Sequence, residues 1–346
     1  MPKRIVGLDI GQTMLRAVEL EDPDKARPKV VRYREVAIPE GVVDAGEVIE
    51  TNTVATLLRR LWIDAGFKTK EVAIGIGNQK VLARDLTIPR QSRALIRESL
   101  PMHVQDLLPV AVDDALMDFY PISEGQGEHG PVLTGLLVAA VKSGIEANIA
   151  ALKEAGLSPV DVDLIPFAMQ RAVGTTTPET SALIDIGAVT TNIVLVTGGV
   201  PQFVRIIPIG GDAITRGLAA QLEVDVTEAE SLKRTIGMDP AGITAEQQQI
   251  ARAVFELSGE LLYSIRNTLN YFANSRPNVQ IGRITLTGGG ARLRGIIAVL
   301  AEMTRTPVDF GNPFQKVGTA RGYQAPEPAV AATMAVSVGL ALGSGS

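Results

Sequence analysis

Two segments of the sequence, separated by about half of its 346 residues, repeat one pattern. Residues 5–18 read IVGLDIGQTMLRAV, and residues 183–196 read LIDIGAVTTNIVLV. Each is an apolar stretch that ends in Asp-Ile-Gly, followed by a short polar turn and a second apolar stretch, which is the pattern of a β-hairpin. A chain whose two halves each open with such a hairpin is expected to fold into two related lobes that face one cleft.

The composition excludes several classes of function. Lysine and arginine total 33 against 38 acidic residues, whereas a nucleic-acid-binding protein needs a basic excess to neutralise phosphates. The chain has no cysteine, which excludes thiolate catalysis, disulfides and cysteine-ligated zinc. Its two histidines, His103 and His129, lack the spacing of a zinc-ligand pair. We therefore expect no nucleic-acid partner and no zinc site built on paired histidines.

Hydropathy predicts a protein that does not enter a membrane. The longest apolar stretch, at 330–342, falls short of the roughly 20 residues that a spanning helix needs. The basic start is followed by an apolar run that Asp9 ends too early for a signal peptide. We expect a soluble, cytoplasmic protein whose final GSGS (343–346) is either a flexible or a cloning-derived tail.

Strands and helices alternate along the chain, which predicts an α/β fold. The predicted strands cover 5–10, 14–20, 29–38, 71–76, 81–88, 133–141, 182–186, 192–197, 202–209 and 282–287. The predicted helices cover 53–65, 143–155 and one long segment at 245–274. The Gly-rich stretch SEGQGEHGP (123–131) is predicted to be an exposed loop.

The two Asp-Ile-Gly turns carry groups that suit a phosphorylated ligand. Glycine lets a turn approach a ligand closely, and successive backbone N–H groups can converge on an anion. The hydroxyls of Thr13, Thr190 and Thr191 add donors, while Asp9 and Asp185 offer carboxylates to Mg²⁺, usually through water. One such turn alone is more simply an ordinary hairpin. Two copies in matching contexts favour a site for the phosphates and metal of a nucleotide.

A third glycine cluster follows a later strand. The segment ITLTGGGARLRG (284–295) places Gly288, Gly289 and Gly290 between a strand and a helix, where a ligand could lie against bare backbone. Arg292 could stack on an adenine, or it could be a surface charge at a helix start. The spacing is neither that of a Walker A loop nor that of a dinucleotide fingerprint.

One further helix has two interpretations. In TEAESLKRTIG (227–237), Thr227 and Glu230 have the spacing of a capping box, which explains Glu230 locally. Lys233 and Arg234 lie one turn later and would hold a ribose or adenine only if this helix borders the cleft.

In this order the segments resemble the actin-like ATPase superfamily. The resemblance covers two phosphate loops (Asp9–Thr13 and Asp185–Thr191), an adenosine loop (Gly288–Arg292) and two connecting helices at 164–174 and 328–342. Within the superfamily, the segments 198–215, 100–122 and 284–314 are similar to the PilM family of type IV pilus assembly proteins, relatives of the cell-division protein FtsA.

The resemblance implies an α/β fold of two ribonuclease-H-like lobes with ATP and Mg²⁺ between them, and a small FtsA-like subdomain inserted in the first lobe. The implied divisions are 1–79 and 159–178 for the first lobe, 80–158 for the insertion, 179–327 for the second lobe and 328–346 for a C-terminal helix of the first lobe.

On the matching positions, Asp9 and Asp185 would act on Mg²⁺. The other implied cofactor-binding residues are Gly11, Thr13, Arg16, Gly187, Thr190 and Thr191 at the phosphates, and Glu230, Lys233, Gly288, Gly289, Gly290 and Arg292 at the ribose and adenine. Relatives usually have lysine where Arg16 stands, so a forked donor replaces a point charge.

The chain departs from its relatives at a position that matters for hydrolysis. Many relatives carry Glu or Gln just before the proline of the first connecting helix, to orient the attacking water, and Ile165 stands there. Asp163 could compensate, although helix capping is its simpler role. Since a missing base typically costs 10²–10⁴-fold in rate, we expect ATP binding with slow or negligible hydrolysis.

The family resemblance also implies partners. It suggests a cytoplasmic scaffold at the inner face of the plasma membrane that binds the cytoplasmic N-terminal tail of the membrane protein PilN, close to the pilus motor ATPases, with self-association open. Two alternatives remain. A small-molecule kinase of the same superfamily would need a carboxylate base and a substrate loop, and an FtsA-like membrane tether would need a basic amphipathic helix at its C-terminus.

Overall fold

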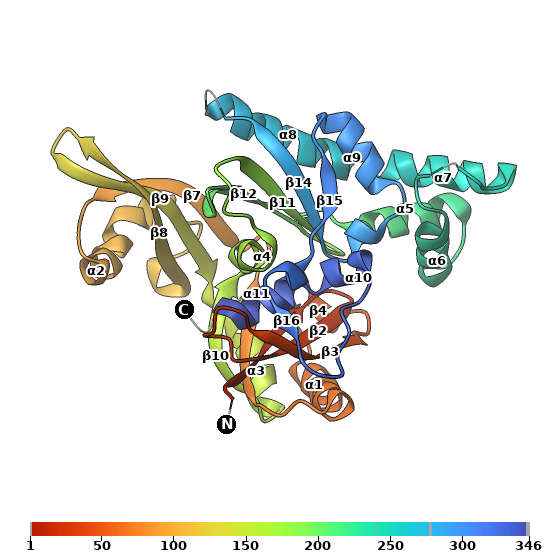
Figure 1. The fold of residues 1–346 in the computed structure, drawn as a ribbon, viewed down its shortest axis with the longest axis horizontal. Coiled ribbons are helices and arrows are strands. Elements are labelled where there is room, and N and C mark those ends of the chain that lie inside the picture. The colour runs from red at the N-terminus through yellow and green to blue at the C-terminus, as the bar shows by residue number, and fades with distance from the viewer. Residues whose placement is uncertain (1, 240, 277–278, 344–346) are drawn as a thin grey trace.

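The computed structural model describes residues 2–239, 241–276 and 279–343, and it shows two lobes side by side (Figure 1). Most of the expected C-terminal tail, 344–346, lies outside the described residues. Within the described part of the chain, no helix has both the length and the apolar character needed to cross a membrane.

The first lobe is built on a six-stranded sheet in the order β10-β6-β1-β2-β3-β16. Its strands are β1 (Arg4–Ile10), β2 (Met14–Glu21), β3 (Lys29–Ala37), β6 (Glu71–Ile76), β10 (Ser158–Leu164) and β16 (Gly318–Thr319). Strands β1, β2 and β3 pair antiparallel, while β6 pairs in parallel with β1, and β10 in parallel with β6. A two-stranded ribbon of β4 (Val43–Asp44) and β5 (Glu47–Val48) lies beside this sheet.

The second lobe repeats this topology. Its sheet has the order β13-β12-β11-β14-β15, with β11 (Thr180–Ile186), β12 (Thr191–Thr197), β13 (Val200–Ile207), β14 (Ile281–Thr287) and β15 (Val308–Phe310). Again three antiparallel strands carry two parallel ones on the side of the first strand. The expectation of two related lobes is therefore confirmed.

Two connecting helices lie between the sheets. Helix α4 (Ile165–Val173) and helix α11 (Ala335–Gly343) share one buried cluster with residues of both sheets, Val18 and Leu20 on one side and Leu183 and Val194 on the other. Gly339 of α11 rests directly on the backbone of α4, so small residues allow the close crossing. The second predicted helix, 328–342, is divided at Met334 into α10 (Pro328–Thr333) and α11.

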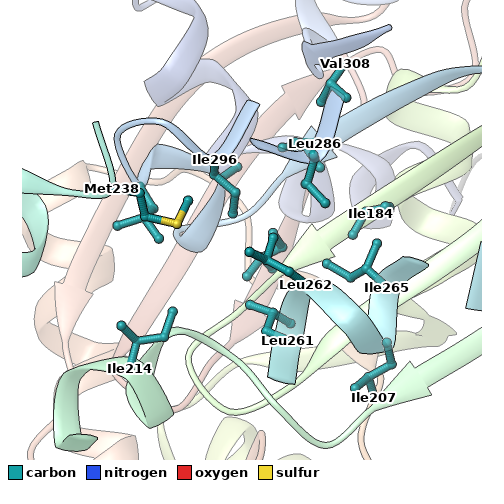
Figure 2. Packing of buried hydrophobic residues seen from close by; sticks show 14 of the residues in the cluster. Ile184, Ile207, Ile214, Met238, Leu261, Leu262, Ile265, Leu286, Ile296 and Val308 are labelled. Atoms are coloured by element: carbon teal, nitrogen blue, oxygen red, sulfur yellow. The ribbon is translucent and has the colours of Figure 1, made fainter. Parts of the chain in front are cut away.

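The outer faces of the sheets are covered by separate helices. On the first lobe, α1 (Thr51–Ala65) and α3 (Lys142–Glu154) pack against each other and the sheet. The second lobe carries α5 (Gly211–Leu222), α6 (Val226–Ile236), α7 (Ala245–Leu257), α8 (Gly259–Ser275) and α9 (Ile296–Thr304). Figure 2 shows its core, where Leu261, Leu262 and Ile265 of α8 meet Ile184 and Leu286 of the sheet.

The prediction of one long helix over 245–274 is wrong in one respect, because the helix is interrupted at Ser258. The Ser258 hydroxyl donates to the carbonyl oxygen of Val254 at 2.7 Å, a back-bond that bends helices, and Gly259 follows. The apolar stripe continues across the break, and for that reason periodicity alone could not reveal it.

A third, smaller sheet in the order β7-β9-β8 projects from the first lobe. It contains β7 (Val81–Pro89), β8 (Ala115–Gly127) and β9 (Gly130–Val141), with α2 (Arg93–Val104) packed on it through Ile96 and Leu100. The expected loop at 123–131 is instead the end of the long β8–β9 hairpin, with backbone pairing up to Gly127 and Gly130. This sheet ends at Val141, and the following α3, which we expected within the insertion, packs with the first lobe, as β10 does.

Candidate functional site

The two Asp-Ile-Gly turns have the same local geometry. The Gly11 amide donates to the Met14 carbonyl at 3.0 Å, and the Gly187 amide donates to the Thr190 carbonyl at 2.9 Å. Both turns line one cavity of about 650 Å³ between the lobes. The cavity wall also brings together the predicted Asp9, Thr13, Arg16, Asp185, Glu230, Lys233, Gly288, Gly289, Gly290 and Arg292.

Two carboxylates, the buried Asp185 and the partly buried Asp9, line this cavity. Burial raises the pKa of Asp9, partly opposed by Arg16. Burial, and next the Asp9 carboxylate, raise the pKa of Asp185 to about 6, although Thr287 donates to its Oδ1 at 2.8 Å. A divalent cation would be stabilising beside two neighbouring carboxylates whose pKa values are both raised.

The donor set of this place fits magnesium. Among the described residues there is no cluster of three or more His, Asp or Glu side chains that could hold a metal, so a cation here would take its remaining ligands from water and phosphate. Mg²⁺ keeps several waters and is commonly held by one or two carboxylates plus substrate phosphates. Asp9 and Asp185 are the residues that would hold it.

Arg16 crosses the cleft from the first lobe. It faces Asp9 in the β1–β2 register, with 3.8 Å between Nη1 and Oδ2, and its Nε lies 3.2 Å from Glu35. Burial lowers the pKa of Arg16, but the surrounding carboxylates outweigh this and raise it, so the guanidinium stays charged. A Cβ atom on Gly289 would lie 3.5 Å from Arg16 Nη2, so this charge reaches the adenosine loop.

The adenosine loop requires glycine because it lies on the second phosphate turn. Gly288 has φ of 84°, and a side chain at Gly290 would collide with Ile186, which directly follows Asp185. The loop then forms a short 3-10 turn over Gly290–Arg292, and Arg292 is exposed at the cavity wall.

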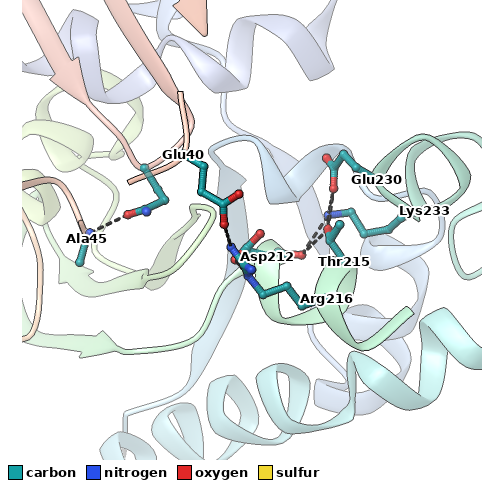
Figure 3. A network of polar contacts seen from close by, with 9 residues as sticks. Glu40, Ala45, Asp212, Thr215, Arg216, Glu230 and Lys233 are labelled. Atoms are coloured by element: carbon teal, nitrogen blue, oxygen red, sulfur yellow. Dashed lines mark hydrogen bonds and ion pairs between the residues drawn. The ribbon is translucent and has the colours of Figure 1, made fainter. Parts of the chain in front are cut away.

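Helix α6 borders the cleft, and its first turn differs from the predicted capping box. Asp225 caps the helix by accepting from the Glu228 amide at 2.9 Å, so neither Thr227 nor Glu230 has a capping role. Glu230 is free to turn to the cleft, where it pairs with Lys233 at 2.6 Å (Figure 3).

Lys233 is buried and already has protein partners. Its Nζ donates to the Thr215 hydroxyl at 2.6 Å and to the Gly211 carbonyl at 2.9 Å, in addition to the Glu230 pair. Burial opposes ionisation of Glu230, but its contacts with Lys233, Thr215 and Arg234 outweigh this and lower its pKa. Lys233 thus fixes α6 against α5 and holds the Glu230 carboxylate in place.

Two predicted residues lie outside the cavity wall that the described residues form. The Thr191 hydroxyl donates to the Ile209 carbonyl at 2.7 Å, away from the phosphate turn. Asp163 forms an ion pair with Arg171 and accepts from the Leu164 amide, so it is occupied within the first lobe. Ile165, by contrast, does line the cavity.

The structure adds residues that sequence reasoning missed. In the second lobe, Asn192 on β12 lies opposite Asp185 on β11. In the first lobe, Arg16 on β2 lies opposite Asp9 on β1 in the same way. Alignment of the two repeats would have revealed this correspondence. At the rim, Glu40 of the first lobe pairs with Arg216 of α5 at 2.9 Å and bridges the lobes, as Figure 3 shows. No local pattern signals this pair.

Comparisons with known proteins agree with this architecture. A solved PilM-PilN type IV pilus biogenesis complex matches with a TM-score of 0.86, 24% identity and coverage of 99% of this chain and 98% of that one. MreB5 of Spiroplasma citri bound to AMPPNP matches with a TM-score of 0.54, 13% identity and coverage of 97% and 94%. The cell-division protein FtsA of Pseudomonas aeruginosa is 24% identical over 91% of this chain and 84% of its own length.

These likenesses show the two-lobed actin-like ATPase fold that the motifs predicted. A family model described as type IV pilus assembly protein PilM matches residues 7–345, nearly the whole chain. The chain therefore belongs to the PilM family of type IV pilus assembly proteins.

Proposed function

We propose that this protein binds ATP with Mg²⁺ in the cleft between its lobes and serves as a cytoplasmic scaffold of the pilus assembly platform. The observation that carries the proposal is the convergence of two equivalent glycine turns and the carboxylates of Asp9 and Asp185 on one cavity. Its volume of about 650 Å³ lies within the usual range for small-molecule sites.

The residues divide by the part of the ligand they would meet. The backbone amides of the two turns, with the hydroxyls of Thr13 and Thr190, would hold phosphates. Mg²⁺ between Asp9 and Asp185 would neutralise the phosphate charge. Glu230 and the loop Gly288–Arg292 would face the ribose and adenine, with Gly289 giving the ring access to bare backbone.

Binding of Mg·ATP tests this proposal by titration calorimetry. We expect one nucleotide per chain with a micromolar dissociation constant, and turnover far below about one per second, the lower end of ordinary enzyme rates. Slow turnover is expected because Ile165 has no acceptor and Asp163 is paired with Arg171. Turnover near one per second that Asp185→Ala abolishes would contradict slow hydrolysis, and an absence of binding would reject the nucleotide site.

The partner we propose is the cytoplasmic N-terminal peptide of a PilN-like membrane protein, which would place the scaffold at the inner face of the membrane. The likeness to a PilM-PilN complex supports this assignment. The surface we assign is the junction of the small sheet with the first lobe, where Leu82, Leu108 and Val110 line a small apolar crevice. Lys80, Ala140 and Val141 line both this crevice and the nucleotide cavity, so the two sites share a wall.

Leu82→Asp is expected to weaken binding of such a peptide by about 10-fold or more, because it replaces an apolar contact of the crevice with a charged side chain. Met102→Asp, on the exposed side of α2, is the matched control and should bind as the parent does. Fluorescence anisotropy of a labelled synthetic peptide, with and without Mg·ATP, measures both. Equal affinities of the two variants for the peptide would show that the peptide does not dock at this crevice.

A further inference from the structure

One arginine joins the two lobes at the rim of the cleft. The Glu40 carboxylate, in the loop after β3, lies 2.9 Å from Nη2 of Arg216 on α5. The Nε of the same guanidinium lies 2.7 Å from Asp212, which is also on α5 (Figure 3). Arg216 thus holds one carboxylate from each lobe at the same time. We call Glu40, Arg216 and Asp212 the cleft strap.

Each end of the cleft strap is bonded to one of the two phosphate turns. In the first lobe, the Ile38 amide donates to the Thr13 carbonyl at 2.9 Å, two residues before Glu40. In the second lobe, the Asp212 amide donates to the Ala188 carbonyl at 2.8 Å. These backbone bonds link the position of each turn to the cleft strap, so a separation of the turns pulls the strap apart.

The pair that crosses the rim lies outside the cavity. Asp212 lines the cavity, but Glu40 and Arg216 are not part of the wall that the described residues form. Both side chains are exposed to solvent, Glu40 by 80% and Arg216 by 55%. A nucleotide in the cavity would therefore meet neither of them. The cleft strap acts on the distance between the lobes and not on the ligand.

The rim is the place where the lobes can part most easily. On the inner side of the sheets, α4 and α11 join both lobes in one buried apolar cluster. The contact between Glu40 and Arg216 is instead an exposed ion pair, which exchanges its partner for water at small cost. Within the described ranges, one other ion pair joins the second lobe to the rest of the chain, from Arg276 to Asp85 of the small sheet at 3.8 Å. Hinged opening of the lobes therefore has to break the cleft strap.

We propose that the cleft strap gates nucleotide exchange, because it holds the lobes together at the rim and slows both the entry and the release of the ligand. The inference rests on the proposed nucleotide site. Since the strap does not touch the ligand, it restrains the lobes equally whether the cavity is filled or not. It therefore lowers both rate constants by the same factor and leaves the dissociation constant unchanged. A residue that contacted the nucleotide would change mainly the dissociation rate constant.

Stopped-flow mixing with a fluorescent ATP analogue and Mg²⁺ measures both rate constants. Glu40→Gln removes the charge at the first-lobe end of the cleft strap. We expect both rate constants to rise about threefold, within the range that exposed ion pairs supply, while the dissociation constant stays within about twofold of the parent value. Arg216→Gln should give the same rise. The double variant should exceed neither single variant, because each of them already lacks the pair.

Arg90→Gln is the matched control. It breaks the ion pair with Glu124, which is about as exposed but lies within the small sheet, and it should leave both rate constants unchanged. Unchanged rate constants in Glu40→Gln overturn the inference. A rise in the dissociation rate constant alone also overturns it, as do additive rises in the double variant.

A second measurement needs no nucleotide. The chain has no cysteine, so spin labels attached at Ile63→Cys on α1 and Glu302→Cys on α9, both exposed positions, report the distance between the lobes. We expect Glu40→Gln to extend the distribution of distances to longer values, and high salt to shift the parent toward the variant. Identical distributions overturn the inference. A parent that binds no analogue rejects the proposed function, and the label distances still decide whether the cleft strap holds the lobes together.

Discussion

Replacing Gly339 with alanine is expected to lower the free energy of unfolding by about 3 kcal/mol or more, the upper end for overpacking in a core. Gly339 lies on α11 where that helix crosses α4, and an added Cβ atom would overlap the carbonyl oxygen of Ala168. Backbone cannot rotate away as a flexible side chain can. Both connecting helices would have to separate, and they lie between the two sheets.

A second glycine in a helix provides the control. Gly259 begins α8, and an added Cβ atom would lie 3.8 Å from the Tyr263 ring, an ordinary contact. Gly259→Ala should therefore be neutral, or should stabilise the protein by up to about 1 kcal/mol through helix propensity. Urea denaturation of both variants measures the difference. Equal stabilities would contradict the close crossing of α4 and α11.

Asp185→Asn is expected to stabilise the metal-free protein while weakening its binding of Mg·ATP. In the metal-free protein the substitution removes a buried charge beside Asp9 and keeps an oxygen to accept from Thr287. The folded carboxyl has a pKa of about 6, raised from 3.8, so at neutral pH the variant should be more stable by on the order of 3 kcal/mol. It should also lose about 100-fold or more in affinity for Mg·ATP, since it removes a carboxylate that the metal needs.

The stability difference between the parent and Asp185→Asn depends on pH, because the pKa of Asp185 differs between the folded and unfolded states. Because the folded pKa is raised, the folded state holds its proton longer than the unfolded state as pH rises from 3.8 to about 6. The parent therefore loses stability across this range relative to the variant. Thermal unfolding in EDTA should show the two proteins converging below pH 3.8 and fully separated above pH 6. Asp309→Asn, at an exposed position of β15, is the control and should follow the parent at every pH.

Repeated local patterns made the two lobes predictable. Continuous apolar runs such as 71–76 and 182–186 fold as strands because both faces of each sheet are covered, by the connecting helices on one side and outer helices on the other. The turns at Gly11 and Gly187 were predictable for the same reason, since each motif is complete within a few residues.

Features that depend on contacts between distant segments were not predictable in this way. The interruption at Ser258 comes from a single side-chain bond within an unbroken apolar stripe. Glu230 is held by Lys233 and by Thr215, which lies on another helix. The capping box that its spacing from Thr227 predicted is therefore wrong. The insertion ends before α3 because α3 packs in the core of the first lobe. The polarity of α3 in the sequence does not reveal which part of the molecule it packs against.

Hydrogen–deuterium exchange with and without Mg·ATP tests most directly whether the duplicated turns form one site. We expect slower amide exchange, on adding Mg·ATP, in three separate segments at once: 9–16 in the first lobe, and 185–192 and 288–292 in the second. Mg²⁺ alone should leave 288–292 unchanged, because only the nucleotide reaches the adenosine loop. Protection confined to one lobe, or none at saturating Mg·ATP, would contradict a nucleotide site built from both repeats.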